Sequence, residues 1–323
     1  MKIGIIGAGA WGTALARLLT EKGNEVMLWF YDTDAYLEAK QKNINPFLPE
    51  CNLNNIILTT ELIKTVSSKD LLLLASPMQH SRSIIEKIKA DIDPKTILVN
   101  CSKGIEATES FTLMSDIIKE LLPEHLRNSC FLSGPSFAKE VAKREKTVVC
   151  IASANLEIAE KVKNIFTTDY FRPCISDDII GVQIAGALKN IIAIAAGIIA
   201  GLGKGENTKA ALVSMGLIEI VRFGIKFGGK LKTFYYPVGV GDLILTCNSI
   251  QSRNYKFGFK IGQGANPDDL IKAFSEVVEG YDTTKAVFKI AETENLNMPI
   301  TAQLHQVLFK GKNPNKAICQ LMA

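Results

Sequence analysis

The chain has 323 residues, 47% of them hydrophobic, and a formal net charge of +4 from 37 basic and 33 acidic residues. This length exceeds one ordinary hydrophobic core and predicts two domains. The basic residues are spread along the chain without a run dense enough to follow a phosphate backbone, so no nucleic-acid partner is expected.

The seven cysteines and three histidines are widely spaced and form no metal-ligand pattern. The odd number of cysteines predicts free thiols in a reducing compartment, so we expect a cytoplasmic protein without a metal. The run from Ile179 to Leu202 has the length of a membrane span, but Gln183, Lys189 and Asn190 lie near its middle. Because a central lysine is costly in lipid, the sequence favours a buried helix over a membrane span.

The first half of the chain alternates short apolar strands with amphipathic helices. This alternation predicts an α/β domain with a parallel sheet covered on both faces. The expected strands are Lys2 to Ile6, Glu25 to Phe30, Leu71 to Ala75, Thr96 to Asn100, Cys130 to Ser133, Thr147 to Ala152 and Phe171 to Ile175.

After Ser176 the alternation stops, and long helical stretches follow. The boundary is expected near residues 176 to 181, which gives an α/β domain of residues 1–177 and an all-α domain of residues 178–323. The expected helices are Asp178 to Ala200, Thr208 to Phe227, Ser252 to Ile261, Pro267 to Ser275, Asp282 to Glu294 and Thr301 to Leu308.

A glycine-rich turn follows the first expected strand directly. Gly7, Gly9 and Gly12 form a GxGxxG motif between that strand and a helix. The three glycines would allow a tight turn, close approach of the backbone to a pyrophosphate and close packing of helix on strand. The N–H groups of Ala10 and Trp11 at the helix start would hold the diphosphate. The motif therefore predicts a dinucleotide-binding domain.

The second expected strand ends at Tyr31 and Asp32, where such a domain meets the adenosine ribose. An acidic residue there favours the free 2′-hydroxyl of NAD over the 2′-phosphate of NADP. Asp32 equally suits the role of N-cap of the following helix, and the sequence leaves both interpretations open.

Two further turns follow expected strands, at the sheet edge where ligands of such domains bind. Lys103 comes after the strand that ends at Asn100 and would point into a crevice with the nicotinamide, or be an ordinary loop lysine. Gly134 and Ser136 follow the strand that ends at Ser133. Ser136 is expected to donate a hydroxyl at a helix N-terminus, or to act as an N-cap.

Lys189 lies in the segment GVQIAGALKNIIAIAAG, among small and aliphatic residues. A helix that is apolar on most sides is buried, so its lysine either faces a cavity or carries a buried charge without a compensating partner. Desolvation lowers the pKa of a lysine toward the range that an acid/base catalyst needs near neutrality. The alternative is a structural lysine that pairs with a carboxylate.

The segment GVGDLILTCNSIQSRN places Asp242 and Thr246 one helical turn apart on the same face. Asp242 is expected to orient Lys189 or to cap its own helix. Ser252, Arg253 and Asn254 then begin another helix, and an arginine beside helix N–H groups suits a phosphate monoester, although Arg253 could also be a surface residue.

Taken together, these motifs resemble the NAD(P)-dependent glycerol-3-phosphate dehydrogenases of the bacterial type. The motifs lie in family order over nearly the whole chain. They are GAGAWGTALA, SKGIE, SGPSFAKE, IGVQIAGALKNIIAI, GVGDLILTC with QSRN, VVEGYDTTK and MPIT.

The resemblance implies an N-terminal Rossmann domain that binds NAD(P), an α-helical substrate and catalytic domain, and an active site in the cleft between them. It implies dihydroxyacetone phosphate and sn-glycerol 3-phosphate as substrates, phospholipid synthesis as the process served, and a homodimer as a possible assembly. Lys189 would be the proton acceptor in alcohol oxidation. The residues expected around the substrate are Lys103, Gly134, Ser136, Lys189, Asp242, Ser252, Arg253 and Asn254.

Contacts to the cofactor, beyond the three glycines, are also carried over from the resemblance. They are Ala10, Trp11, Tyr31, Lys103, Ala138, Arg253, Val277 and Glu279. Many family members have histidine or arginine at the position of Tyr31, and a tyrosine cannot neutralise a 2′-phosphate. Two rival functions are a related lysine-dependent dehydrogenase of hydroxy acids or sugar acids, and a protein that senses NAD(H) without chemistry.

Overall fold

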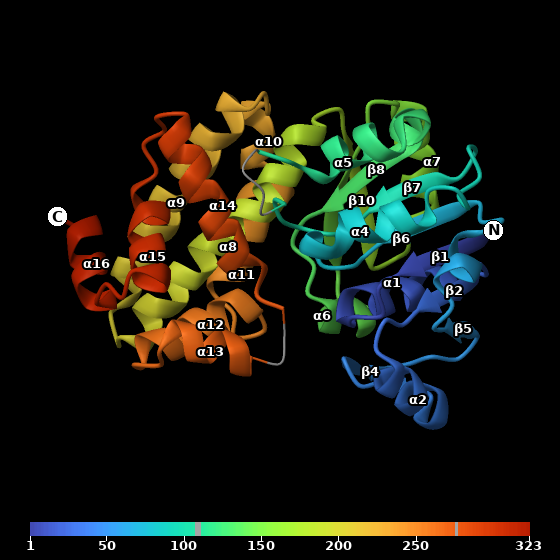
Figure 1. Cartoon of the computed structure of the whole chain (residues 1–323), viewed down its shortest axis with the longest axis horizontal. Helices are drawn as coiled ribbons and strands as arrows, with labels where there is room; N and C mark the ends of the chain where they lie inside the picture. The colour runs from blue at the N-terminus through green and yellow to red at the C-terminus, as the bar shows by residue number, and fades with distance from the viewer. Residues whose placement is uncertain (107–110, 275–276) are drawn as a thin grey trace. The chain divides into compact units, whose positions relative to one another are not determined.

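The computed structural model describes residues 1–106, 111–274 and 277–323, and its chain forms two compact units (Figure 1). Unit 1 comprises Met1–Ser102 and Met114–Ile179, and unit 2 comprises Lys103–Leu113 and Ile180–Ala323. The described residues 103–106 and 111–113 therefore pack with unit 2, although they precede the expected domain boundary by many residues. Each unit has its own hydrophobic core.

Unit 1 contains a sheet of eight strands, in the order β10-β9-β8-β7-β6-β1-β2-β5. A separate pair, β3 and β4, is antiparallel. The strands are β1 (Lys2–Ile6), β2 (Glu25–Trp29), β3 (Ile44–Asn45), β4 (Leu48–Asn52), β5 (Ile56–Thr59), β6 (Leu71–Leu74), β7 (Ile97–Asn100), β8 (Ser129–Ser133), β9 (Thr147–Ala152) and β10 (Phe171–Ser176). The predicted α/β fold is confirmed, and the strand order reverses at β1 and β6, where doubly wound sheets bind their ligands.

Helices cover both faces of this sheet. The helix α1 contacts both α6 and α7, and α4 contacts both α3 and α5 (Figure 1). The helices of unit 1 are α1 (Ala10–Glu21), α2 (Thr33–Lys42), α3 (Leu62–Val66), α4 (Met78–Ile88), α5 (Met114–Leu121), η1 (Pro123–Asn128), α6 (Ala138–Ala142) and α7 (Leu156–Phe166).

The prediction of a wholly parallel sheet is wrong at one pair of strands. β8 and β9 are antiparallel, with Ser133 opposite Cys150 and Phe131 opposite Ala152. The connection between them holds the five-residue α6 instead of a full crossover helix, and only a crossover brings the next strand back parallel. The sequence analysis also missed β3, β4 and β5, which are short and interrupted by turns.

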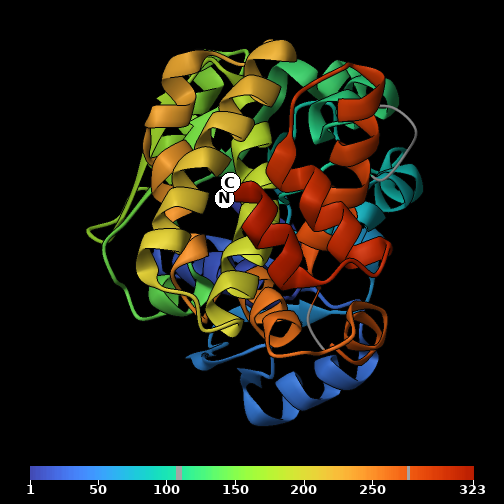
Figure 2. The same ribbon diagram turned by 90° about the vertical axis from the view of Figure 1, so that its left-hand side faces the viewer.

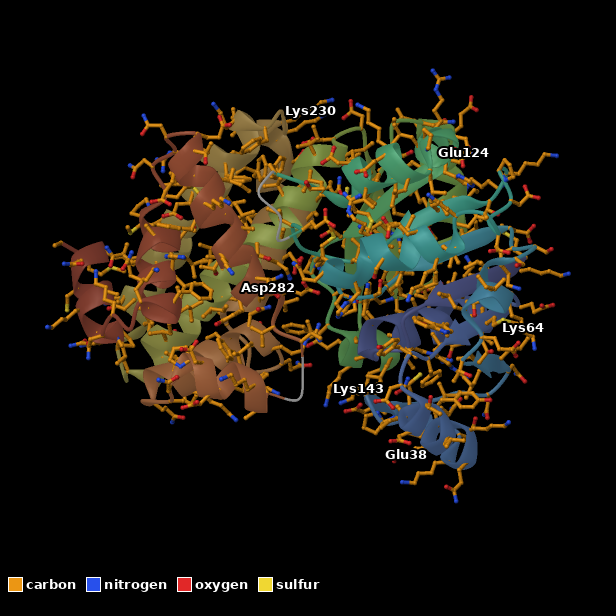
Figure 3. The ribbon with its side chains drawn as sticks, in the orientation of Figure 1. Glu38, Lys64, Glu124, Lys143, Lys230 and Asp282 are labelled. Carbon is orange, nitrogen blue, oxygen red and sulfur yellow. The ribbon has the colours of Figure 1, made fainter. Side chains whose placement is uncertain are left out.

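Surface charges of opposite sign are interspersed on unit 1. Figure 3 shows the labelled side chains of Glu38 on α2 and Lys64 on α3 at its surface. Glu38 pairs with Lys42 at 2.8 Å, and Lys64 pairs with Glu61 at 3.4 Å. Exposed pairs of this kind contribute at most about 1 kcal/mol to stability.

Unit 2 is helical, and α15 and α16, in red, lie at the front of Figure 2, in contact with each other. The predicted helix Pro267 to Ser275 is described as far as Ala273, and Ser275 lies outside the described residues. The helices are α8 (Ile179–Gly201), α9 (Glu206–Lys226), α10 (Leu231–Tyr235), η2 (Pro237–Gly241), α11 (Asp242–Cys247), α12 (Arg253–Gly262), α13 (Pro267–Ala273), α14 (Glu279–Thr293), α15 (Pro299–Phe309) and α16 (Pro314–Leu321).

The helix α8 is the core of unit 2. Among the helices that the structure describes, α8 alone is long and apolar enough to cross a membrane, but 89% of its most apolar stretch is buried inside the protein. Glycines let α12 pack directly on it: a Cβ at Gly258 would lie 2.0 Å from the Ile194 oxygen, and one at Gly197 would lie 2.1 Å from the Tyr255 oxygen. This contact fixes the start of α12 against α8.

A buried carboxylate explains the MPIT segment. Glu219 on α9 accepts hydrogen bonds from the N–H groups of Ile300 and Thr301 and from the Thr301 hydroxyl. These N–H groups belong to the first turn of α15, which has no intrahelical partners for them. Burial raises the pKa of Glu219, while the hydrogen bonds oppose that rise. The segment therefore docks α15 onto α9.

Candidate active site

The glycine-rich turn of unit 1 lies at the point where the strand order reverses. Gly7 follows β1 with a φ of 114°, a backbone conformation that favours glycine. A Cβ there would lie 2.8 Å from the carbonyl carbon of Ala75, which follows the neighbouring β6. A Cβ at Gly12 would lie 2.0 Å from the Gly7 oxygen, so α1 packs directly against the turn.

The start of α1 suits an anionic diphosphate. Gly9 is the N-cap of α1, and a Cβ at Gly9 would meet no atom within 4 Å, so the backbone there is open to a ligand. Ala10 and Trp11 are the first residues of the helix, and their N–H groups belong to the set without intrahelical partners. The residues present therefore fit a nicotinamide dinucleotide.

Asn45 supports this turn, and the sequence analysis missed it. The side chain is fully buried, and its Nδ2 donates to the Ala8 oxygen at 2.8 Å and to the Thr13 hydroxyl at 2.7 Å. Ala8 lies inside the glycine motif and Thr13 in the first turns of α1. No local pattern in the sequence indicated this role, because both hydrogen-bond partners of Asn45 lie more than 30 positions away along the chain.

Replacing Asn45 by alanine is expected to weaken NAD(P)H binding by about 1–2 kcal/mol, because two buried acceptors in the turn lose their donor. Titration of NADH by fluorescence, together with the melting temperature, measures this effect. Asn54→Ala is the matched control, since Asn54 is exposed and its contact is with Asn43. Equal affinity in the two variants would contradict a positioning role for Asn45.

Tyr31 and Asp32 follow β2. Tyr31 is 87% exposed and meets Trp29 edge to face at 6.0 Å between ring centroids. Asp32 is the N-cap of α2, and its Oδ1 accepts from the Ala35 N–H at 3.0 Å. The capping interpretation of Asp32 is therefore correct, and the carboxylate keeps its second oxygen for other donors.

The SGPS turn after β8 differs from expectation at Ser136. Gly134 has a φ of 144°, and a Cβ there would lie 2.9 Å from the Cα of Val149 on β9. The Ser136 hydroxyl donates to the Gly134 oxygen at 3.0 Å. The helix α6 begins at Ala138 with Phe137 as N-cap, so the alternative in which Ser136 caps this helix is wrong. The hydroxyl instead tightens the turn.

A buried cluster of charges in unit 2 is formed by Lys103, Lys189 and Asp242. The Lys189 Nζ lies 2.6 Å from Asp242 Oδ1, and the Lys103 Nζ lies 2.8 Å from Asp242 Oδ2. The side chains of Lys189 and Asp242 are 9% and 1% exposed, and that of Lys103 is 19% exposed. One carboxylate thus bridges two ammonium groups that come from distant parts of the sequence.

The cluster shifts the protonation of its members. Burial, together with the charge of Lys103, lowers the pKa of Lys189 to about 8, and the charge of Asp242 opposes this shift. Burial acts to raise the pKa of Asp242, but the charges of Lys103 and Lys189 hold it below its usual value. Asp242 is therefore ionised at neutral pH, whereas Lys189 can gain or lose a proton near it.

Thr246 completes the surroundings of the Lys189 amine. The Lys189 Nζ donates to the Thr246 hydroxyl at 2.8 Å, and this hydroxyl donates to the main-chain oxygen of Asp242 at 2.5 Å. Asp242 and Thr246 lie one turn apart on α11, as predicted. An ammonium group has three donors, so two are directed at these partners and the third can serve a substrate oxygen.

The start of α12 is tied to the same helix as Lys189. Asn254 is buried; its Nδ2 donates to Asn190 Oδ1 at 3.0 Å, and its Oδ1 accepts from the Gly280 N–H at 2.9 Å. Ser252 is the N-cap of α12 and accepts from the Tyr255 N–H at 3.2 Å. Arg253, the first residue of α12, is exposed between them.

Val277 and Glu279 were expected to contact the cofactor only because of the family resemblance, and no local sequence pattern indicated this role. Val277 is 44% exposed, and Glu279 is the first residue of α14. The Asn254 hydrogen bond to Gly280 fixes the start of α14 to the start of α12.

The structure thus joins two of the expected site segments of unit 2 through Asn254, and it joins Lys103, Lys189 and Asp242 directly. The remaining residues expected to contact cofactor or substrate, Ala10, Trp11, Tyr31, Gly134, Ser136 and Ala138, lie in unit 1.

Family models and curated relatives match nearly the whole chain. Family models described as the N-terminus and C-terminus of NAD-dependent glycerol-3-phosphate dehydrogenase match residues 2–159 and 178–319. The chain is 42% identical to glycerol-3-phosphate dehydrogenase (NAD(P)+) of Leptospira biflexa, over 100% of this chain and 98% of the relative. It is 43% identical to the Bacillus subtilis enzyme of the same name, over 100% of this chain and 94% of the relative.

A solved structure is similar over nearly the whole chain as well. The crystal structure of glycerol-3-phosphate dehydrogenase from Coxiella burnetii has a TM-score of 0.94 and 34% sequence identity. The match covers 99% of this chain and 98% of that chain.

Proposed function

The chain belongs to the NAD-dependent glycerol-3-phosphate dehydrogenase family, and we propose that Lys189 is the acid/base of its reaction. The reaction is the reversible interconversion of dihydroxyacetone phosphate and sn-glycerol 3-phosphate with NAD(P)(H). The observation that carries the proposal is the buried Lys189 amine, held by Asp242 and Thr246 with a pKa of about 8. A group with this pKa exchanges protons readily near neutral pH.

The nicotinamide dinucleotide, when bound, supplies the hydride for reduction and accepts it in oxidation. In reduction, the Lys189 ammonium donates a proton to the oxygen of the ketone as it becomes an alkoxide. In oxidation, the neutral Lys189 amine accepts the proton of the alcohol. The remaining ammonium donor of Lys189 is the one that would contact this oxygen.

The neighbours of Lys189 orient it and tune its charge. Asp242 and Thr246 fix the position of the amine through two hydrogen bonds. Asp242 also favours the protonated amine, whereas Lys103 opposes it. Lys103 adds a second positive charge on the other oxygen of Asp242, where it would stabilise negative charge on the substrate.

Reduction of the ketone and oxidation of the alcohol should depend on pH in opposite ways. Reduction needs the ammonium form of Lys189, so kcat/KM for dihydroxyacetone phosphate is expected to be constant below pH 8 and to fall above it. Oxidation needs the neutral amine, so kcat/KM for glycerol 3-phosphate is expected to rise up to pH 8. Steady-state rates in both directions over pH 6 to 10 measure this. Profiles of the same sign would contradict the assignment.

We propose that the start of α12 binds the substrate phosphate. Arg253 is exposed there beside the first N–H groups of a ten-residue helix, and an arginine with such groups matches a phosphate monoester. Asn254 keeps this helix start beside Asn190, the neighbour of Lys189. Binding energy from the phosphate would then position the ketone for reaction.

Arg253→Ala is expected to raise KM for dihydroxyacetone phosphate by about 10- to 150-fold, from the loss of a charged hydrogen bond worth about 1.5–3 kcal/mol. The reduction of unphosphorylated dihydroxyacetone should change little in the same variant. Arg127→Ala, which removes an exposed arginine of η1 in unit 1, is the control. An equal loss with both ketones would argue against a phosphate role and in favour of a general structural one.

Three further properties belong to the same proposal. The product would feed phospholipid synthesis, and the enzyme would work in the cytoplasm. We propose a homodimer as the assembly, supported by the exposed Ile218 and Ile225, which lie seven residues apart on one face of α9.

A further inference from the structure

Two cysteines of unit 1 are neighbours across the sheet. Cys174 on β10 and Cys150 on β9 are paired in register in a parallel ladder, so their side chains lie on the same face of the sheet. Neighbouring strands lie about 4.8 Å apart. That spacing falls within the separation of about 4.4–6.8 Å between Cα atoms that a disulfide bridges. Both residues are free thiols in this structure.

The two thiols differ in access to solvent. β10 is an edge strand, and Cys174 is exposed, whereas Cys150 is buried. Phe171 packs against Phe166 of α7, and alternation along β10 turns Cys174 toward the opposite face. An edge strand is hydrogen bonded on one side alone, so it can move slightly to let the two sulfur atoms approach.

We propose that Cys174 and Cys150 form an oxidation site at which hydrogen peroxide converts the two thiols into a disulfide between β10 and β9. The exposed Cys174 meets the oxidant first, and the buried Cys150 closes the bond. Neither residue belongs to the machinery assigned to the dehydrogenase reaction.

The chemistry balances in two steps. The Cys174 thiolate attacks one oxygen of peroxide, the O–O bond breaks, and the hydroxide released takes up a proton and leaves as water. This step gives a sulfenic acid at Cys174. The Cys150 sulfur then attacks the Cys174 sulfur, the S–O bond breaks, and hydroxide leaves as water with the Cys150 proton. In sum, two thiols and one peroxide give one disulfide and two waters, with peroxide reduced by two electrons.

The protonation of the pair agrees with these roles. The interaction with the Cys150 thiol lowers the pKa of Cys174 to about 7, with a smaller contribution from the charge of Lys163. The same interaction and burial raise the pKa of Cys150, and the charge of Asp178 adds to that rise. A solvent-accessible thiolate beside a second thiol is the arrangement typical of cysteines that peroxide oxidises reversibly.

The test uses the reduced full-length chain, treated with hydrogen peroxide near pH 7, blocked with an alkylating reagent and digested for mass spectrometry. The expected product is a linked pair of peptides that contain Cys150 and Cys174, two hydrogen atoms lighter than the separate peptides and restored by a dithiol reductant. Cys319 is the internal control, because it is also exposed. Cys174 should react with peroxide roughly tenfold faster than an ordinary exposed thiol of pKa about 8.5.

Two variants separate the steps. In Cys150→Ser, Cys174 should still be oxidised but should accumulate as sulfenic acid, which a dimedone probe traps, and then as sulfinic acid, which is detected by its mass. Cys319→Ser should form the disulfide as the unaltered chain does. The proposal is overturned if the linked peptides do not form in the unaltered chain, or if Cys174 reacts no faster than Cys319. NADH consumption with dihydroxyacetone phosphate is measured separately, so failure here leaves the dehydrogenase assignment intact.

Discussion

Lys189→Met is expected to lower kcat for reduction of dihydroxyacetone phosphate by about 10²–10⁴-fold, the usual contribution of a positioned general acid. Methionine keeps much of the length of the side chain and is compatible with the apolar surroundings of α8. The glycine turn that we assign to the cofactor lies in the other unit, so the affinity for NADH should stay close to that of the unaltered enzyme. Stopped-flow or steady-state absorbance gives the rate, and fluorescence titration gives the affinity.

The control for this variant is Lys204→Met. Lys204 follows the end of α8 and is exposed, so its loss should change neither rate nor affinity. A Lys189→Met enzyme that is folded, binds NADH and turns over at a near-normal rate would remove Lys189 from the mechanism.

Asp242→Asn is expected to have the largest effect on stability. The buried carboxylate faces two ammonium groups, and its loss leaves both without their shared counter-charge. Removing one partner of a buried ion pair costs about 3–5 kcal/mol. The free energy of unfolding, from urea denaturation, measures this loss. Asp269→Asn, at an exposed position in α13 of the same unit, is the matched control.

The same variant should also move the pH profile. Asp242 raises the pKa of Lys189, so its neutralisation lowers that pKa below about 8. The pH above which reduction declines should therefore shift to lower values. If Asp242→Asn retained both the stability and the pH profile of the unaltered enzyme, the bridging role of Asp242 would be wrong.

Much of the fold could be predicted because its signals are local. The strands β1, β6 and β7 are short apolar runs, which is typical of buried parallel strands. The GxGxxG spacing directly after β1 is typical of the turn in a dinucleotide-binding domain. The antiparallel pairing of β8 with β9 could not be predicted, because strand direction depends on how the chain between them is routed. The turns between Asn43 and Thr59 separate three short strands: β3 and β4 pair with each other, and β5 pairs with β2, which lies earlier in the sequence.

Residues of the site that follow a local pattern could be predicted, whereas contacts between distant parts of the sequence could not. An apolar helix interrupted by Lys189 indicated a buried amine, and the spacing of Asp242 and Thr246 placed them on one face. That Lys103 shares the carboxylate of Asp242 could not be seen, since the two residues are 139 positions apart. The role of Asn45 was missed for the same reason, because its partners lie 32 and 37 positions away.

The assignment of function is tested most directly by following NADH absorbance when the purified chain meets dihydroxyacetone phosphate, with the product identified by mass spectrometry. We expect consumption of NADH in step with formation of glycerol 3-phosphate, and much slower consumption with ketopantoate or another keto acid. No consumption with the phosphorylated ketone, or equal rates with the keto acid, would contradict it.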